Sequence, residues 1–61
     1  MDIKTARRKL NMSQQELAIA AGVSRISIAR YESGERIPDI VTAAKIANAL
    51  GCKVDDLIKE E

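Results

Sequence analysis

The chain has 61 residues, which is enough for one small domain and too few for two. Ten Lys and Arg residues nearly balance nine Asp and Glu residues, and the chain contains one cysteine and no histidine. This composition excludes an internal disulfide and argues against a four-ligand zinc site and against catalysis by a histidine base. We therefore expect no metal, no cofactor, no catalytic residue and no enzymatic activity.

The sequence also argues against a membrane protein and against a binder of single-stranded nucleic acid. No run of 18 apolar residues is present, and no apolar segment follows the basic N-terminal region. Tyr31 is the only aromatic residue, whereas single-strand binders stack bases on several. We expect a cytoplasmic protein. Basic residues outnumber acidic ones in residues 1–36 and the reverse holds in 37–61, which points weakly to a polyanion partner on one side.

The first predicted helix lies at the N-terminus. Ile3, Ala6 and Leu10 follow the spacing i, i+3 and i+7, which predicts a helix that runs to Lys9 or Leu10. Asn11 follows as a residue suited to the stop.

Two short helices are predicted next. Ser13 and Glu16 have the spacing of a capping box, so the second helix begins there. Gly22 interrupts it, because glycine permits the positive φ of a tight turn. Ser24 is suited to cap a third helix, which we expect to end near Glu32.

The remaining residues predict a loop and two more helices. Proline disfavours helix in the loop 35–38, and Asp39 is a good N-cap for a fourth helix that ends at Gly51. A fifth, short helix is expected from Val54 to Lys59. The fourth helix carries a predicted buried stripe of Ile40, Ala43, Ala44, Ala47 and Leu50. Residues 1–61 thus predict a single all-α domain of five helices.

Residues 14–33 have the spacing of a helix-turn-helix. Ala18 is small where the two helices would cross, and Val23 and Ile28 are apolar where the second helix must pack back. In this motif the second helix is offered to the major groove of DNA. Gln14, at the start of the first of these helices, is suited to a phosphate contact through its side chain or backbone N–H.

Helical-wheel geometry, at about 100° per residue, separates two faces of the second of these helices. Ile28 and Tyr31 define the buried side. The opposite face is small, basic and free of acidic residues, and consists of Arg25, Ile26, Ala29 and Arg30, with Ser27 at its edge. Arginine makes bidentate contacts to guanine and a short aliphatic group touches a thymine methyl, so this face suits DNA base edges.

These residues resemble the Cro/repressor-type (XRE-like) helix-turn-helix family of bacterial and phage regulators, over residues 3–58. The matching positions are 13–18, 22–24, Ile28, 31–34, Arg36, Pro38, 50–51 and Leu57. The resemblance implies a compact, lambda-repressor-like five-helix domain that binds duplex DNA. It further implies a repressor that binds a palindromic operator as a two-fold homodimer.

Carried over to this chain, the resemblance makes the helix 24–32 the DNA reader and implies an ion pair between Arg7 and Glu32. The expected DNA-binding residues are Gln14, Ser24, Arg25, Ile26, Ser27, Arg30 and Arg36. Lys53 departs from the family, which usually has a hydroxyl cap there. The expected dimer contact lies in the C-terminal helix, with Val54, Leu57 and Ile58 as core or dimer surface.

Two other functions fit the same fold. One is an antitoxin that binds a toxin and represses its own operon. The other is a protein-interaction module that has lost DNA binding, although the acid-free face of the reading helix argues against it. At the level of single residues, Arg25 and Arg30 can also solvate a surface helix, and Ile26 would be core in a rotated helix.

Overall fold

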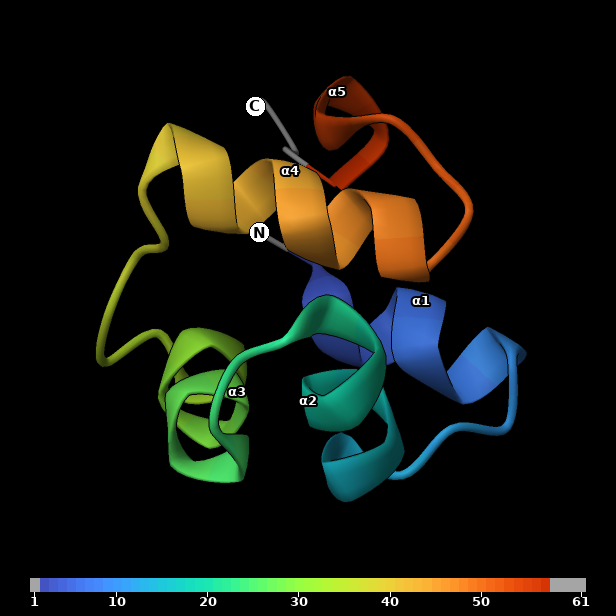
Figure 1. The fold of residues 1–61 in the computed structure, drawn as a ribbon, viewed down its shortest axis with the longest axis horizontal. Coiled ribbons are helices and arrows are strands. Elements are labelled where there is room, and N and C mark those ends of the chain that lie inside the picture. The colour runs from blue at the N-terminus through green and yellow to red at the C-terminus, as the bar shows by residue number, and fades with distance from the viewer. Residues whose placement is uncertain (1, 58–61) are drawn as a thin grey trace.

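The computed structural model describes residues 2–57, which form five helices and no strand. The helices are α1 (Ile3–Lys9), α2 (Gln14–Ala21), α3 (Arg25–Ser33), α4 (Ile40–Ala49) and α5 (Val54–Leu57). In Figure 1, α4 runs across the upper half of the molecule with α5 above it, and α2 and α3 lie below it. The predicted all-α, five-helix architecture is confirmed. The end of the predicted fifth helix, after Leu57, lies outside the described residues.

Side-chain caps fix the start of three helices. The Ser13 hydroxyl accepts from the Glu16 backbone N–H at 3.0 Å, and a Glu16 carboxylate oxygen accepts from the Ser13 N–H at 2.7 Å. Ser24 caps α3 by accepting from the Ser27 N–H at 3.1 Å, and Asp39 caps α4. These oxygens satisfy backbone donors that a helix leaves without partners at its start. The predicted starts of α2, α3 and α4 are therefore confirmed.

A residue with positive φ lies at or just after the end of each of α1, α2, α3 and α4, namely Asn11, Gly22, Gly34 and Gly51. Gly22, at φ 71°, ends α2 and lets the chain reverse into α3 within three residues. Asn11 is the one non-glycine residue with positive φ among the described residues, at 56°. It follows the last turn of α1, as predicted, because asparagine tolerates this conformation better than most residues.

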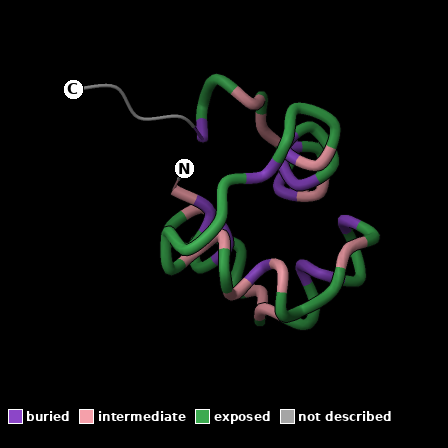
Figure 2. The backbone as a smooth tube through the Cα atoms, turned by 90° about the vertical axis from the view of Figure 1, so that its left-hand side faces the viewer, coloured by how far each residue is buried: buried purple, intermediate pink, exposed green. Residues whose placement is uncertain are grey.

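The core takes one large side chain from each helix. The five largest fully buried side chains are Ile3, Leu17, Ile28, Ile46 and Leu57. Burying such a side chain stabilises a fold by about 1.5–3 kcal/mol relative to leaving it exposed. Tyr31 is half-buried against this cluster, as predicted. Figure 2 shows the buried segments of the helices turned toward one another.

The predicted buried stripe of α4 is wrong at two positions. Ile40 is 76% exposed and Ala44 is also exposed, whereas Ile46, which the stripe omitted, is fully buried. The buried positions of α4 begin at Ala43, where the helix packs on α2. Ile40 lies one turn before that contact, and Ala44 points to the side of the helix away from it.

Candidate nucleic-acid interface

The segment 14–33 folds as two helices joined by a tight turn. The Val23 N–H donates to the Ala18 carbonyl at 3.0 Å, which closes the turn against the end of α2. Ala18 is 2% exposed and Ile28 is fully buried, so the small side chain and the apolar one lie between the helices as predicted. Figure 1 shows α2 and α3 side by side. The predicted helix-turn-helix is present.

The side of α3 away from the core carries the predicted reading face. Arg25, Ile26 and Arg30 are exposed, with Ile26 at 56%, so the alternative of a rotated helix with Ile26 in the core is wrong. Arg30 lies 3.8 Å from the Glu35 carboxylate, and both side chains are well exposed. An exposed pair of this kind contributes little and leaves the guanidinium free to take another partner.

Ser24 and Ser27 are engaged with each other at the start of α3. The Ser24 hydroxyl donates to the Ser27 hydroxyl oxygen at 2.9 Å and also accepts from the Ser27 N–H. Ser24 is exposed and Ser27 is half-buried. The Ser24 hydroxyl therefore caps the helix, the Ser27 hydroxyl bonds to that cap, and each oxygen retains a lone pair for a further contact.

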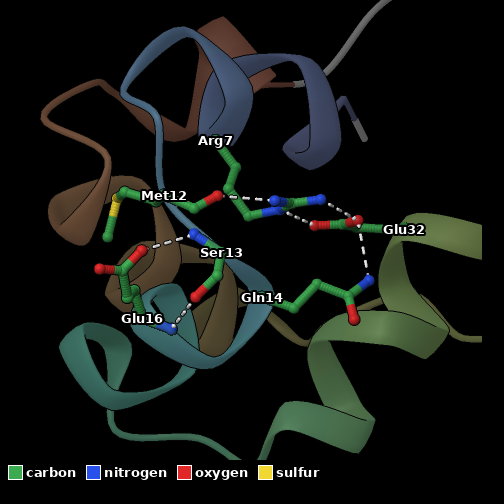
Figure 3. A network of polar contacts seen from close by, with 6 residues as sticks. All are labelled: Arg7, Met12, Ser13, Gln14, Glu16 and Glu32. Atoms are coloured by element: carbon green, nitrogen blue, oxygen red, sulfur yellow. Dashed lines mark hydrogen bonds and ion pairs between the residues drawn. The ribbon is translucent and has the colours of Figure 1, made fainter.

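Arg7 and Glu32 form the predicted ion pair, which ties α1 to the end of α3 (Figure 3). The Arg7 Nε lies 2.7 Å from Glu32 Oε2, and Nη2 donates to Oε1 at 3.1 Å. The side chains are 10% and 4% exposed. A further bond from Arg7 Nη1 reaches the Met12 carbonyl at 2.7 Å. The bidentate geometry uses the planar fork of arginine fully.

Gln14 joins the same network from the start of α2. Its Nε2 donates to Glu32 Oε1 at 3.2 Å (Figure 3). The sequence did not predict this bond, because nothing local in the chain indicates which side chain of α3 lies opposite Gln14. The amide keeps a second N–H and its carbonyl oxygen for other partners. Three helices therefore meet at one buried carboxylate.

The network holds Glu32 in its charged form. Burial alone would raise the pKa of the Glu32 carboxyl, but hydrogen bonds from Arg7 and Gln14 and the charges of Arg7 and Lys4 lower it below its usual value. The hydrogen bond to Glu32 in turn raises the pKa of Arg7. The pair is therefore fully ionised at neutral pH.

Arg36 lies in the loop after α3. It is exposed, and its backbone N–H donates to the Arg30 carbonyl at 3.2 Å. This bond keeps the loop against the C-terminal end of α3. Arg30 and Arg36 are both exposed and, because of this bond, lie at the same end of the helix.

Three further observations concern metal-binding groups, the cysteine and membrane-spanning helices. Within residues 2–57, no group of three or more His, Cys, Asp or Glu side chains is placed to hold a metal ion. Burial and the nearby Asp56 charge raise the pKa of the half-buried Cys52 thiol. Over the same range, no helix is both long enough and apolar enough to span a bilayer.

Comparison with known proteins places the chain in a family. A sequence model of the family described as "Helix-turn-helix" matches residues 3–57. An uncharacterised HTH-type transcriptional regulator of Archaeoglobus fulgidus is 42% identical over 55 residues, covering 90% of this chain and 78% of that protein. The cryptic phage CTXphi transcriptional repressor RstR of Vibrio cholerae is 39% identical over 51 residues, covering 84% of this chain and 46% of the repressor. The chain spans about half the length of that repressor.

Two solved structures have the same fold. The crystal structure of the P22 c2 repressor in complex with a synthetic operator matches with a TM-score of 0.88 and 32% identity, over 97% of this chain and 89% of that one. The solution structure of the DNA-binding domain of the same repressor matches with a TM-score of 0.86 and 29% identity, over 98% and 86%. The chain belongs to the helix-turn-helix family, as its motifs indicated. The curated relatives from Archaeoglobus fulgidus and Vibrio cholerae are named as transcriptional regulators, one of them uncharacterised and the other a phage repressor.

Proposed function

We propose that the protein is a transcriptional regulator that binds duplex DNA at specific sequences and acts as a repressor. The helix 24–32 reads the major groove. The observation that carries this function is the exposed, acid-free face of α3, with Arg25, Ile26 and Arg30, on a helix-turn-helix. Support comes from the P22 c2 repressor, which has the same fold and was solved with an operator.

The proposed contacts divide into two kinds. Base contacts, which carry the sequence preference, are hydrogen bonds from Arg25 and Arg30 to guanine and an apolar contact of Ile26 with a thymine methyl. Backbone contacts, which carry most of the affinity, come from Gln14 and Arg36. Ser24 and Ser27 complete the set at the start of α3, where hydroxyls and free backbone N–H groups suit a phosphate or a base edge.

The proposed assembly is a homodimer on a palindromic operator. Two copies related by a two-fold axis would place their reading helices about 34 Å apart, one turn of DNA. The expected contact through the C-terminal helix needs a correction, because Leu57 is 1% exposed and belongs to the core. Val54 is half-buried, and Ile58 lies outside the described residues. The proposed place of action is the cytoplasm, on the chromosome.

The test is selection from a randomised duplex pool at physiological salt, followed by sequencing of the bound fraction. An enriched palindrome with half-sites one turn apart is the expected result. The control is a variant carrying Arg25→Ala and Arg30→Ala, both at exposed positions, with its fold checked by circular dichroism. Binding without enrichment would contradict sequence specificity, and no binding by the folded wild type would contradict the function.

A further inference from the structure

An acidic side chain, Glu35, lies beside Arg30 at the end of the reading helix. Glu35 Oε2 is 3.8 Å from Arg30 Nε, and the two side chains are 63% and 48% exposed. Arg25, on the same exposed face of α3, forms no ion pair with any residue in the range 2–57. One of the two arginines of the reading face therefore has an acidic neighbour, and the other does not.

The backbone of the turn that ends α3 fixes the position of Glu35. Gly34, at φ 82°, reverses the chain at the end of the helix. The Glu35 N–H then donates to the Arg30 carbonyl at 3.0 Å and to the Ser33 hydroxyl oxygen at 3.3 Å. The same hydroxyl donates to the Arg30 carbonyl at 3.1 Å. These bonds hold the residue that carries the carboxylate next to Arg30.

The stability of the fold does not account for an acidic residue at this position. An exposed ion pair contributes little to stability. The C-terminal end of a helix carries a partial negative charge, which favours a cation there and disfavours a carboxylate. A negative charge next to Arg36 also opposes the attraction to phosphates on which affinity for DNA depends. Glu35 thus gives little to the fold and lowers the general attraction to DNA.

The carboxylate pairs with one edge of the Arg30 guanidinium and leaves the other free. The ion pair is on the Nε side, so the N–H groups of Nη1 and Nη2 remain available. Two such N–H groups are enough for a bidentate contact with O6 and N7 of guanine. Glu35 can therefore stay paired with Arg30 while Arg30 binds a guanine. Because DNA excludes water from the pair, the attraction between the two charges is then stronger than in the free protein.

We propose that Glu35 is a specificity-determining residue, which favours guanine over phosphate as the partner of Arg30. On a matching sequence, the carboxylate stays paired with Nε and orients the guanidinium toward the base. On other sequences, the partners open to Arg30 are chiefly phosphates, and the carboxylate competes for the guanidinium and repels them. Glu35 thus lowers the affinity for non-matching DNA more than the affinity for the matching site. This proposal rests on the proposed function and adds to it a residue outside the reading helix.

The first test uses Glu35→Gln, which keeps the shape of the side chain and removes its charge. Binding is titrated against the selected duplex and against a scrambled duplex of the same length and composition. The affinity for the scrambled duplex is expected to rise about two- to fivefold, which corresponds to the strength of an exposed ion pair. The affinity for the selected duplex is expected to stay unchanged or fall, so the ratio of the two affinities decreases.

Two further variants serve as controls for charge and for folding. Asp55→Asn removes the same charge at an exposed position on α5, which lies on the other side of α4 from α3 in Figure 1. It is expected to change the affinity for both duplexes by the same factor. Glu35→Ala, which also removes the orienting oxygen, is expected to lose at least as much discrimination as Glu35→Gln. Thermal melts of all variants check that they are folded.

A second test determines whether Glu35 acts through Arg30. On the scrambled duplex, Glu35→Gln is expected to steepen the slope of log affinity against log salt by about one, because Arg30 then contacts a phosphate. In a chain that already carries Arg30→Ala, Glu35→Gln is expected to leave both this slope and the ratio of the two affinities unchanged. A loss of discrimination that persists without Arg30 would overturn the proposal.

The titrations separate this proposal from the proposed function. If wild type prefers the selected duplex and Glu35→Gln discriminates equally well, the role of Glu35 is overturned and the proposed function stands. If wild type binds the selected and scrambled duplexes equally, the proposed function is contradicted, and the role of Glu35 with it. A decrease in discrimination in Glu35→Gln but not in Asp55→Asn would support both.

Discussion

The helices α3 and α4 have nearly the same length, at nine and ten residues, yet they leave opposite kinds of side chain exposed. The outer side of α3 presents Arg25 and Arg30, and the outer side of α4 presents Ile40 and Val41. Charge on a helix surface suits a polyanion, and apolar area suits a protein. The two exposed faces of one small domain therefore suit two different kinds of partner.

The two helices are also held in place differently. Ile28 is the one fully buried residue of α3, which is little for a helix that must stay in a fixed orientation. The buried Glu32 carboxylate supplies the missing constraint through its bonds to Arg7 and Gln14. By contrast, α4 is held by apolar packing, with Ile46 fully buried. A reading surface with few apolar residues thus depends on a polar network behind it.

Breaking that network should have the largest effect on the fold. Glu32→Ala leaves the Arg7 guanidinium buried without its partner, which costs about 3–5 kcal/mol of unfolding free energy. Chemical denaturation of purified protein measures it. The matched control is Glu35→Ala, which removes an exposed partner 3.8 Å from Arg30 and should cost under about 1 kcal/mol. Equal stability of Glu32→Ala and wild type would contradict the claim that the network of Arg7, Gln14 and Glu32 stabilises α3.

Truncating two isoleucines of α4 should distinguish its buried side from its exposed side by their effects on stability. Ile46→Ala opens a cavity under the helix and should cost about 2–5 kcal/mol. Ile40→Ala removes the same atoms from a side chain that is 76% exposed and should change stability by less than about 0.5 kcal/mol in the monomer. Thermal melts at low protein concentration compare them. Similar losses in both variants would mean that Ile40 is packed after all.

On the α3 side, Arg30 should carry sequence information. We predict that Arg30→Ala costs about 1–3 kcal/mol of binding at the selected site and relaxes the preference at one base position. The measurement is a titration against the selected duplex and its single-base variants. A loss of the same size on every sequence would make Arg30 a phosphate contact instead.

Arg36 should behave differently from Arg30, although both lie at the same end of α3. Arg36→Ala is expected to weaken binding to all sequences alike and to reduce the slope of log affinity against log salt by about one. Titrations at several salt concentrations measure that slope. An unchanged slope of log affinity against log salt would contradict a contact between Arg36 and the DNA backbone.

The sequence predicted the parts of the fold and of the site that depend on neighbouring residues. A cap such as Ser24 acts within one helical turn, so it can be found from spacing alone. The exposed face of α3 followed from helical geometry once Ile28 was assigned to the core. The ion pair between Arg7 and Glu32, which are 25 positions apart, was predicted only from the resemblance to the family.

The errors came from contacts between distant segments. The stripe on α4 was wrong because apolar residues occur on more of this helix than α2 can cover. Ile40 and Ile46 are the same residue type, and only the position of the contact with α2 decides which is buried. The bond of Gln14 to Glu32 was missed for the same reason, since it depends on how α2 and α3 are placed.

The smallest predicted effect is the response of the α3 network to acid. Because Glu32 has a lower pKa in the folded chain than when unfolded, its stabilising contribution is complete above its unfolded pKa, about 4.3. That contribution is lost as the pH falls through the pKa of Glu32 in the folded chain.

Glu32→Gln has no charge to lose. We therefore expect it to be less stable than wild type at pH 7. We also expect it to lose less stability than wild type between about pH 4 and pH 2. Asp39 also has a lowered pKa, from its hydrogen bonds with Thr42, so Asp39→Asn serves as the control for acid loss at the α4 cap. The same acid response in Glu32→Gln and wild type would place the relevant titration outside the network that holds α3.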